Sequence, residues 1–150
     1  MKNPKYFRGR IILSGCLVLN DNNEILLLYR KDHQHYETPG GKIDLKDCSN
    51  PENPTLEELA KAAEREIYEE LGNKIRIKKL EYFMAVEFKT PGGRDAIAHK
   101  FITKILSGKP IINEPYLFSR IDYLPINSLN FYPISPDLGL LLKHLNKLRR

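Results

Sequence analysis

Three glutamates in the middle of the chain, Glu66, Glu69 and Glu70, are spaced at i, i+3 and i+4. On an α-helix, which turns by roughly 100° per residue, this spacing brings their carboxylates onto one face. Like charges this close repel each other, so the cluster destabilises the fold unless a cation offsets it. Carboxylate oxygens suit hard divalent ions such as Mg²⁺ and Mn²⁺. The spacing indicates a metal site, and the alternative is a solvated acidic face that Arg65 and Lys61 partly neutralise.

The residues around this cluster predict a helix with well-defined ends over 55–71. Thr55 and Glu58 have the spacing of a capping box, in which each side chain satisfies a backbone N–H that the helix start leaves unpaired. Pro54 keeps the preceding chain out of the helix, and Gly72 supplies a left-handed stop. Apolar residues recur every four positions and form one buried stripe, which comprises Leu59, Ala63, Ile67 and Leu71.

The end of this helix closely resembles the second half of the Nudix box. That box reads Gly, five residues, Glu, seven residues, then Arg-Glu-apolar-any-Glu-Glu-any-Gly-apolar, and Arg65 to Gly72 reads Arg-Glu-Ile-Tyr-Glu-Glu-Leu-Gly. Glu57 lies in the place of the first glutamate, and Pro39-Gly40-Gly41 resembles the start of the box. Few chance sequences match so many fixed positions. By this resemblance the chain is identified as a member of the Nudix hydrolase superfamily, similar to its MutT-like members.

The chain departs from the box in two places. Fifteen residues, where the family usually has five, separate Gly41 from Glu57. Residues 45–54 are therefore predicted to form an inserted, exposed loop. An uninterrupted count would place the first carboxylate at Asp47 instead of Glu57. Asn73 stands where an aliphatic residue is usual.

The resemblance also implies a role for individual residues. Arg65 would orient the acidic cluster by pairing with a glutamate, and Glu57 is the favoured partner. A divalent ion, Mg²⁺ or Mn²⁺, would neutralise a pyrophosphate and stabilise charge on the leaving phosphate. The implied metal ligands are Glu66, Glu69, Glu70 and the backbone carbonyl of Gly41.

The box does not determine which carboxylate activates the attacking water. Within it, Glu69 and Glu57 are candidates. Outside it, Glu87 and Asp95 flank a predicted turn, and Glu114 begins a polar connection that resembles the loop bordering the cleft in relatives. Of these three Glu114 is favoured, because strand residues near a hairpin tip usually point into solvent.

A polar loop after the second predicted strand would border the substrate cleft, by the same resemblance. Arg30, His33 and Tyr36 are the candidates there for contacts with phosphate or base. His33 and His35 lie two residues apart, and solvated loop histidines are favoured over metal ligands at this spacing. Gly92 and Gly93 are interpreted as turn residues, because no P-loop spacing surrounds them.

The elements predicted from the sequence alternate between strands and helices. Turn residues at 20–23 predict a hairpin between the first two strands, and Thr90 to Gly93 predicts another. The order indicates an α/β (α+β) fold, and the resemblance implies an α/β/α sandwich with a mixed β-sheet in a single domain over residues 1–150. Strands are expected at 7–20, 24–31, 75–89, 96–106 and 120–125, a short extended piece at 41–45, and helices at 55–71 and from about 136.

The composition fits one globular domain. A chain of 150 residues with 41% hydrophobic content can bury a core without disulfides. Cys16 and Cys48 match neither a disulfide framework nor a metal-ligand spacing, so reduced thiols and a cytoplasmic location are expected.

The basic start followed by residues 11–19 could pass for a secretory signal, but no small-residue cleavage site follows it. No apolar run reaches the length of a membrane span. The net charge of +5 attracts anions without choosing among them.

The resemblance leaves several substrates open. A nucleoside triphosphate pyrophosphohydrolase of MutT type ranks first, because the chain is compact, and an ADP-ribose or dinucleoside polyphosphate hydrolase ranks second. Nucleic acid is not expected as a partner except as an RNA 5′ end, and the chain is expected to be a monomer or homodimer. From another class, a non-catalytic Nudix-fold regulator would bind a nucleotide or RNA. The presence of Glu57, Glu66, Glu69 and Glu70 argues against it.

Overall fold

The computed structural model describes residues 6–7, 10–44, 46, 48–50 and 52–148. Its helices are α1 (Leu56–Leu71), α2 (Pro136–Leu145) and two short 3₁₀ helices, Ile126–Phe131 and Asn146–Leu148. Its strands are β1 (Tyr6–Phe7), β2 (Arg10–Val18), β3 (Glu24–Arg30), β4 (His35–Glu37), β5 (Gly40–Lys42), β6 (Ile75–Ile77), β7 (Glu81–Lys89), β8 (Asp95–Thr103), β9 (Ile105–Gly108) and β10 (Phe118–Pro125).

The largest sheet is mixed. Its strands follow the order β1-β2-β8-β7, and β5 also pairs with β2. The β2–β8 pair is parallel, whereas β1, β5 and β7 pair antiparallel. A second sheet has the order β10-β3-β4, and β6 pairs with β9 in a third. The expected mixed sheet is confirmed.

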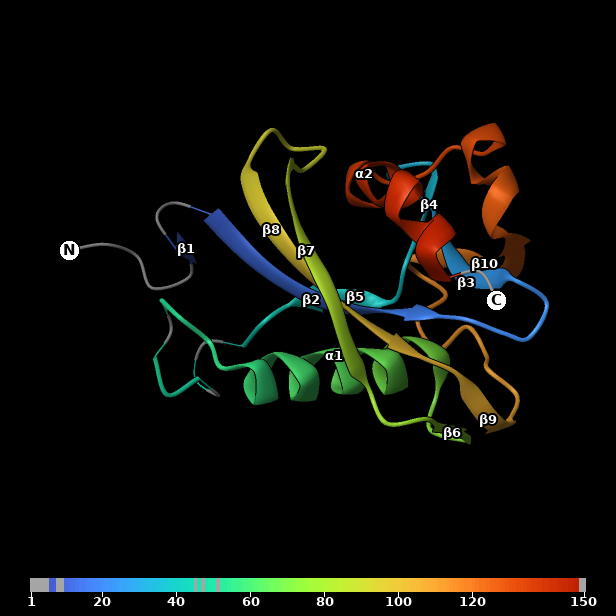
Figure 1. The fold of residues 1–150 in the computed structure, drawn as a ribbon, viewed down its shortest axis with the longest axis horizontal. Helices are drawn as coiled ribbons and strands as arrows, with labels where there is room; N and C mark the ends of the chain where they lie inside the picture. The colour runs from blue at the N-terminus through green and yellow to red at the C-terminus, as the bar shows by residue number, and fades with distance from the viewer. Residues whose placement is uncertain (1–5, 8–9, 45, 47, 51, 149–150) are drawn as a thin grey trace.

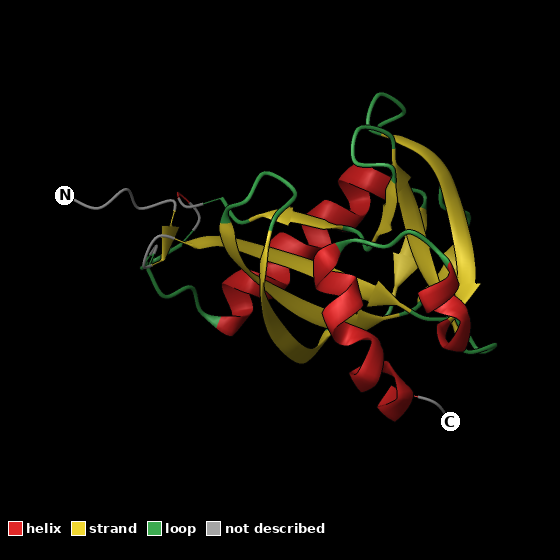
Figure 2. Cartoon of the chain, turned by 90° about the horizontal axis from the view of Figure 1, so that it is seen from above, coloured by secondary structure: helices red, strands yellow, loops and turns green. Residues whose placement is uncertain are grey.

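Two hydrophobic cores lie on opposite faces of β2 and β3. Successive side chains of a strand point to opposite faces, so Cys16 packs in the core that includes α1, and Leu17 packs in the core that includes α2. Figure 1 shows α1 on one side of the strands and α2 on the other. From above, α2 lies in front of the strands and α1 behind them (Figure 2). The expected α/β/α sandwich is confirmed.

The hairpin predicted between the first two strands is wrong. A tight turn with Asn23 at φ 57° does connect β2 to β3, but a single bridge, Leu19 to Ile25, joins them before they diverge into different sheets. A strand has only two edges for hydrogen bonding. Those of β2 pair with β8 on one side and with β1 and β5 on the other, while β3 pairs with β10 and β4. No edge is left for a β2–β3 ladder.

The predictions for the turn at Thr90 to Gly93 and for the two ends of α1 are confirmed, whereas the strand expected over 75–89 is divided into β6 and β7. Strands β7 and β8 form an antiparallel hairpin, and Gly93 in its turn has φ 82°. Helix α1 begins with the expected capping box: the Glu58 amide donates to Thr55 Oγ1 at 3.1 Å, and the Thr55 amide donates to Glu58 Oε1 at 2.8 Å. Gly72, at φ 87°, ends the helix.

Residues 45, 47 and 51 of the predicted insertion, including the alternative carboxylate Asp47, lie outside the described residues. The described residues between 46 and 54 are exposed or partly buried. Cys16 is buried, and burial raises the pKa of its thiol to about 12. No helix in the described part of the chain has the length and apolar character needed to cross a membrane.

Candidate active site

The three clustered glutamates lie at the C-terminal end of α1. The apolar stripe of the helix faces the core, and Glu70 lies at its edge with only 5% of its surface exposed. The Glu66 side chain is 13% exposed, whereas that of Glu69 is 47% exposed. The cluster therefore runs from a buried carboxylate to one in solvent.

Strand β5 packs directly against the two more buried carboxylates. The Gly40 amide donates to Glu70 Oε1 at 3.3 Å. A Cβ atom added at Gly41 would lie 2.6 Å from Glu66 Oε1, which is closer than van der Waals contact allows. Glycine at this position is what permits the carboxylate to approach the backbone of β5.

The surroundings of the cluster make ionisation costly. Burial raises the pKa of Glu66, and the charge of Glu69 adds to the effect. Burial also raises the pKa of Glu70 well above its usual value, and the charge of Glu66 raises it further. A bound cation would offset both the burial and the repulsion. Clustered carboxylate oxygens beside a glycine backbone fit a hard divalent ion.

Arg65 neutralises part of the cluster. Its Nη1 atom lies 3.1 Å from Glu66 Oε2 and 2.9 Å from Glu69 Oε1. The expected pairing with Glu57 is not found among the described residues. Glu57 is exposed in the first turn of α1, eight residues from Arg65 and therefore about 12 Å away along the helix axis. Glu57 and Arg65 line a separate hollow near Asp44.

We expect Arg65→Ala to lower activity by about 10–100-fold, which is typical for losing a residue that orients metal ligands. Added Mg²⁺ should partly restore the rate, because the carboxylates remain. Titrations of activity with Mg²⁺ measure this. Lys61→Ala is the matched control, since Lys61 is an exposed cation on the same helix. Unchanged metal dependence in Arg65→Ala would contradict the role.

The loop between β9 and β10 places Glu114 beside the cluster. The Asn113 amide donates to the Glu70 carbonyl at 3.1 Å, and Asn113 Nδ2 donates to the Glu69 carbonyl at 2.9 Å. The charge of Glu114 contributes to the raised pKa of Glu66. The other two candidate bases, both on the β7–β8 hairpin, form ion pairs: Glu87 with Arg10 of β2, and Asp95 with Lys89 of the same hairpin.

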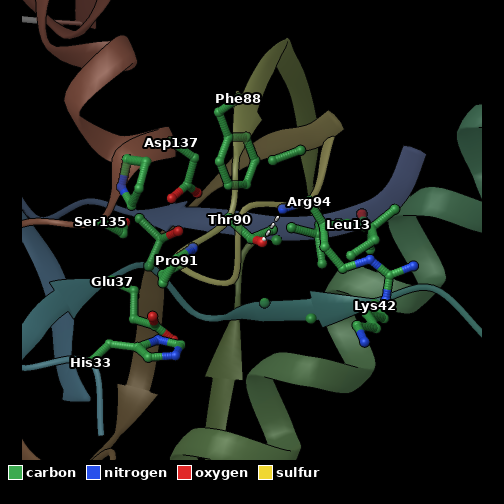
Figure 3. Close-up of a pocket in the computed structure, with 18 of the residues that line it drawn as sticks. Leu13, His33, Glu37, Lys42, Phe88, Thr90, Pro91, Arg94, Ser135 and Asp137 are labelled. Atoms are coloured by element: carbon green, nitrogen blue, oxygen red, sulfur yellow. Dashed lines mark hydrogen bonds between the residues drawn. The ribbon is translucent and has the colours of Figure 1, made fainter. Parts of the chain in front are cut away.

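A cavity of about 320 Å³ adjoins the cluster. Gly40 and Gly41 line one side of it, and the tip of the β7–β8 hairpin lines another. Figure 3 shows Phe88 and Asp137 in the upper part of the cavity and Glu37 and His33 at its lower left. The turn glycine Gly92, which the sequence indicated only as a turn residue, is part of the wall.

A buried ion pair between β8 and the first turn of α2 lines one end of the cavity. Lys100 Nζ donates to Asp137 Oδ2 at 2.6 Å and to Thr38 Oγ1 at 2.7 Å. Burial alone would raise the pKa of Asp137, but the Lys100 ammonium outweighs it and lowers that pKa. Ser135, which also lines the cavity, has a buried Oγ with no hydrogen-bond partner among the described residues. The side chains at this end of the cavity can donate hydrogen bonds to a polar ligand and accept hydrogen bonds from it.

The three candidate substrate-binding residues have different surroundings. His33 lines the cavity. Tyr36 points to the opposite face of β4, where its hydroxyl donates to Asp122 Oδ2 at 2.7 Å in the second core. Arg30 bonds Asp32 and Glu37 and is not part of the cavity wall. The structure therefore brings His33, but not Arg30 or Tyr36, to the cavity.

Sequence reasoning missed Lys100, Asp137, Thr38 and Phe88. One signal was present for Lys100, which continues the alternation of the buried Ala96 and Ala98 along β8. A charged residue at an interior position requires a partner. Asp137 carried no comparable signal, because an acidic residue in the first turn of a helix is ordinary.

Comparisons with known proteins agree with this architecture. The family model of the NUDIX domain matches residues 10–145. No curated protein matches the sequence. A MutT NUDIX hydrolase from Burkholderia pseudomallei is 24% identical, with a TM-score of 0.70 over 88% of this chain and 95% of that chain.

Two further solved structures share the fold. A MutT protein from Methanosarcina mazei Go1 is 18% identical, with a TM-score of 0.71 over 93% of this chain and 94% of that chain. The NUDIX domain of Shewanella oneidensis NrtR, complexed with ADP ribose, is 17% identical, with a TM-score of 0.68 over 98% of this chain and 93% of that one. Because the family model spans residues 10–145, nearly the whole sequence, the chain belongs to the NUDIX domain family of hydrolases.

Proposed function

We propose that the chain hydrolyses a nucleoside triphosphate to a nucleoside monophosphate and pyrophosphate. Water adds across one phosphoanhydride bond, so one new P–O bond forms as one breaks. The observation that carries the proposal is that Gly40 and Gly41 contact the acidic cluster and also line the cavity. A phosphate chain at β5 would therefore have a base or sugar directed toward Phe88 and the Lys100–Asp137 pair.

The proposed metal is Mg²⁺ or Mn²⁺, held by Glu66, Glu69, Glu70 and the carbonyl of Gly41. When bound, it would neutralise the polyphosphate and stabilise charge on the leaving phosphate. Arg65 would keep Glu66 and Glu69 in position through its two ion pairs. Lys42 and Arg94, which line the cavity, add positive charge that attracts the substrate.

At the far end of the cavity, the polar groups suit the edge of a nucleobase. The Asp137 carboxylate accepts hydrogen bonds, the Lys100 ammonium donates them, and Ser135 can do either. Phe88 offers an apolar ring on the same wall. A buried pair of donor and acceptor rejects ligands that cannot satisfy both.

The direct test is hydrolysis of a panel of nucleotides with Mg²⁺ or Mn²⁺. We expect turnover of at least one ribo- or deoxyribonucleoside triphosphate, with pyrophosphate as a product. ADP-ribose is the second candidate, because the NrtR domain of similar fold was solved with that ligand. Exclusive turnover of ADP-ribose or a dinucleoside polyphosphate would replace the proposed substrate. Tight nucleotide binding without turnover would favour a regulator.

Glu114 is the proposed general base. Its loop is bonded to the end of α1, and its charge is close enough to act on Glu66. In this role it takes a proton from the attacking water, and the glutamates of the box remain ligands. Loops of this kind can close when substrate binds.

We expect Glu114→Gln to lower kcat by about 100-fold or more, in the range typical for losing a general base. The acidic limb of the kcat profile should flatten, because the group that must be deprotonated is gone, while the Mg²⁺ affinity stays the same. Glu87→Gln is the matched control, since Glu87 is an exposed carboxylate on the hairpin. A wild-type rate and pH limb in Glu114→Gln would place the base in the box.

A further inference from the structure

Three potential metal ligands that the proposed reaction does not use lie together in the cavity wall, on β4 and the turn before it. His33, His35 and Glu37 each offer one ligand atom, and these atoms lie within 4.8 Å of one another. The His35 Nε2 and Glu37 Oε2 atoms are already 2.8 Å apart, and the rings of His33 and His35 have centroids 5.3 Å apart. We propose that these three side chains bind a divalent transition metal ion such as Zn²⁺.

The alternation of β4 produces this arrangement. His35 and Glu37 are two residues apart on the strand and share a face, while Tyr36 between them points into the second core. Gln34, at φ 53°, turns the chain so that His33 lies beside His35. The sequence favoured solvated loop histidines, but His35 is buried and both rings line the cavity.

The ligand types distinguish this site from the acidic cluster. Two imidazoles and one carboxylate suit Zn²⁺, Co²⁺ or Ni²⁺, whereas Mg²⁺ prefers oxygen ligands alone. Three protein ligands leave at least one coordination position open, as in zinc sites that bind a water or a substrate. All three residues line the cavity, so this position would face the space that receives the nucleotide.

The surrounding groups favour a cation and hold the ligands in place. Asp32 and Glu37 carry two negative charges, and Arg30 offsets one of them through contacts with both. Arg30 Nη1 lies 3.4 Å from Glu37 Oε1, so the other carboxylate oxygen, Oε2, remains directed at His35. The backbone of β4 pairs with β3, and the Tyr36 amide donates to the Pro133 carbonyl at 2.8 Å. Because these ligands are already held in place, their side chains lose little conformational freedom when they bind an ion.

The test is calorimetric titration of the whole protein with Zn²⁺ in excess Mg²⁺, which competes with Zn²⁺ for the oxygen ligands of the acidic cluster. We expect one Zn²⁺ per chain, and His33→Asn should weaken its binding by at least about tenfold. Glu37→Gln should weaken it similarly. His33 is exposed, so His33→Asn is the variant expected to fold normally, which circular dichroism checks.

Two control variants separate this site from the rest of the molecule. His144→Asn removes a histidine on α2, and Glu69→Gln removes a carboxylate of the acidic cluster. Both should bind Zn²⁺ as the wild type does, and the visible spectrum of the Co²⁺-loaded protein should change only in the His33 and Glu37 variants. Wild-type Zn²⁺ affinity in His33→Asn, or its loss in Glu69→Gln, would overturn the proposal. Binding is measured without substrate, so the result is independent of which nucleotide is hydrolysed.

Discussion

Glu70→Gln is expected to lower the rate of hydrolysis with Mg²⁺ by more than about 100-fold, a larger loss than removal of a supporting residue causes. Gln keeps the size of the side chain and can still accept from the Gly40 amide, so the fold should survive. The loss follows from removing the most buried negative charge of the cluster. Metal titrations should show weaker binding as well as a lower maximal rate.

The same variant should be more stable than the wild type without metal. Glu70 has a raised pKa in the folded protein, so its contribution to stability is complete below the unfolded pKa of about 4.3 and is lost as pH rises through the folded value. The wild type should therefore lose stability over that interval, and Glu70→Gln should lose less. Thermal unfolding in a chelator at about pH 5 and about pH 8 measures the difference.

Glu64→Gln is the matched control for both measurements. Glu64 is exposed on the same helix, so its loss should change neither the metal dependence nor the pH dependence of unfolding. Near wild-type hydrolysis by Glu70→Gln would refute the metal assignment. An unchanged Tm without metal would instead refute the electrostatic account of the cluster.

Asp137→Asn should reduce the free energy of unfolding by about 3–5 kcal/mol, because it leaves the buried Lys100 ammonium without its charge partner. The pKa of Asp137 is lowered in the folded protein. Its contribution is therefore present above the unfolded pKa of about 3.9 and is lost as pH falls through the folded value. Urea unfolding at neutral and acidic pH should show the largest difference between variant and wild type at neutral pH.

The chain provides a matched comparison for this pair. Lys89 and Asp95 are also 2.6 Å apart, but both side chains are mostly exposed. Asp95→Asn should lower the free energy of unfolding far less than Asp137→Asn does, since solvent screens exposed pairs. A cost in Asp137→Asn no greater than in Asp95→Asn would show that burial does not control the energetics.

A double variant separates stability from substrate binding. Replacing both charges, in Lys100→Met with Asp137→Leu, should recover much of the lost stability, because two apolar side chains need no partner. It should not recover nucleotide affinity if this pair contacts the base. Recovery of the wild-type KM would place the base elsewhere in the cavity.

Local sequence patterns predicted the structural features that depend only on residues close together in the sequence. The capping box at Thr55, the Gly72 stop and the glutamate spacing of α1 could all be read from segments of a few residues. The prediction of a β2–β3 hairpin is wrong. The turn between the two strands can be recognised from the sequence, but the pairing of β8 and β5 with the edges of β2 cannot. Pairing between distant strands depends on the whole fold.

The candidate site likewise contains residues that could be predicted from local sequence and residues that meet only in the folded chain. Glu66, Glu69 and Glu70 lie on one helix, so their proximity follows from helical geometry alone. Lys100 and Asp137 come from β8 and α2 and meet only in the folded chain. Strand alternation places Tyr36 on the face opposite His35 and Glu37, but the polar sequence of this segment indicates a loop, whereas the structure has strand β4 there.

The hydrogen bonds that join the β9–β10 loop to the end of α1 should couple the local opening of these two parts of the site. The Ile111 amide donates to the Leu71 carbonyl at 2.9 Å, and the Asn113 amide donates to the Glu70 carbonyl. These loop amides can exchange with deuterium only when the loop separates from the helix end, so their protection reports the local opening of both. An opening that moves Glu114 away also breaks the hydrogen bonds that the loop donates to the backbone carbonyls of Glu69 and Glu70. An ion bound to the glutamates should therefore slow deuterium uptake at Ile111 and Asn113, although neither residue contacts it.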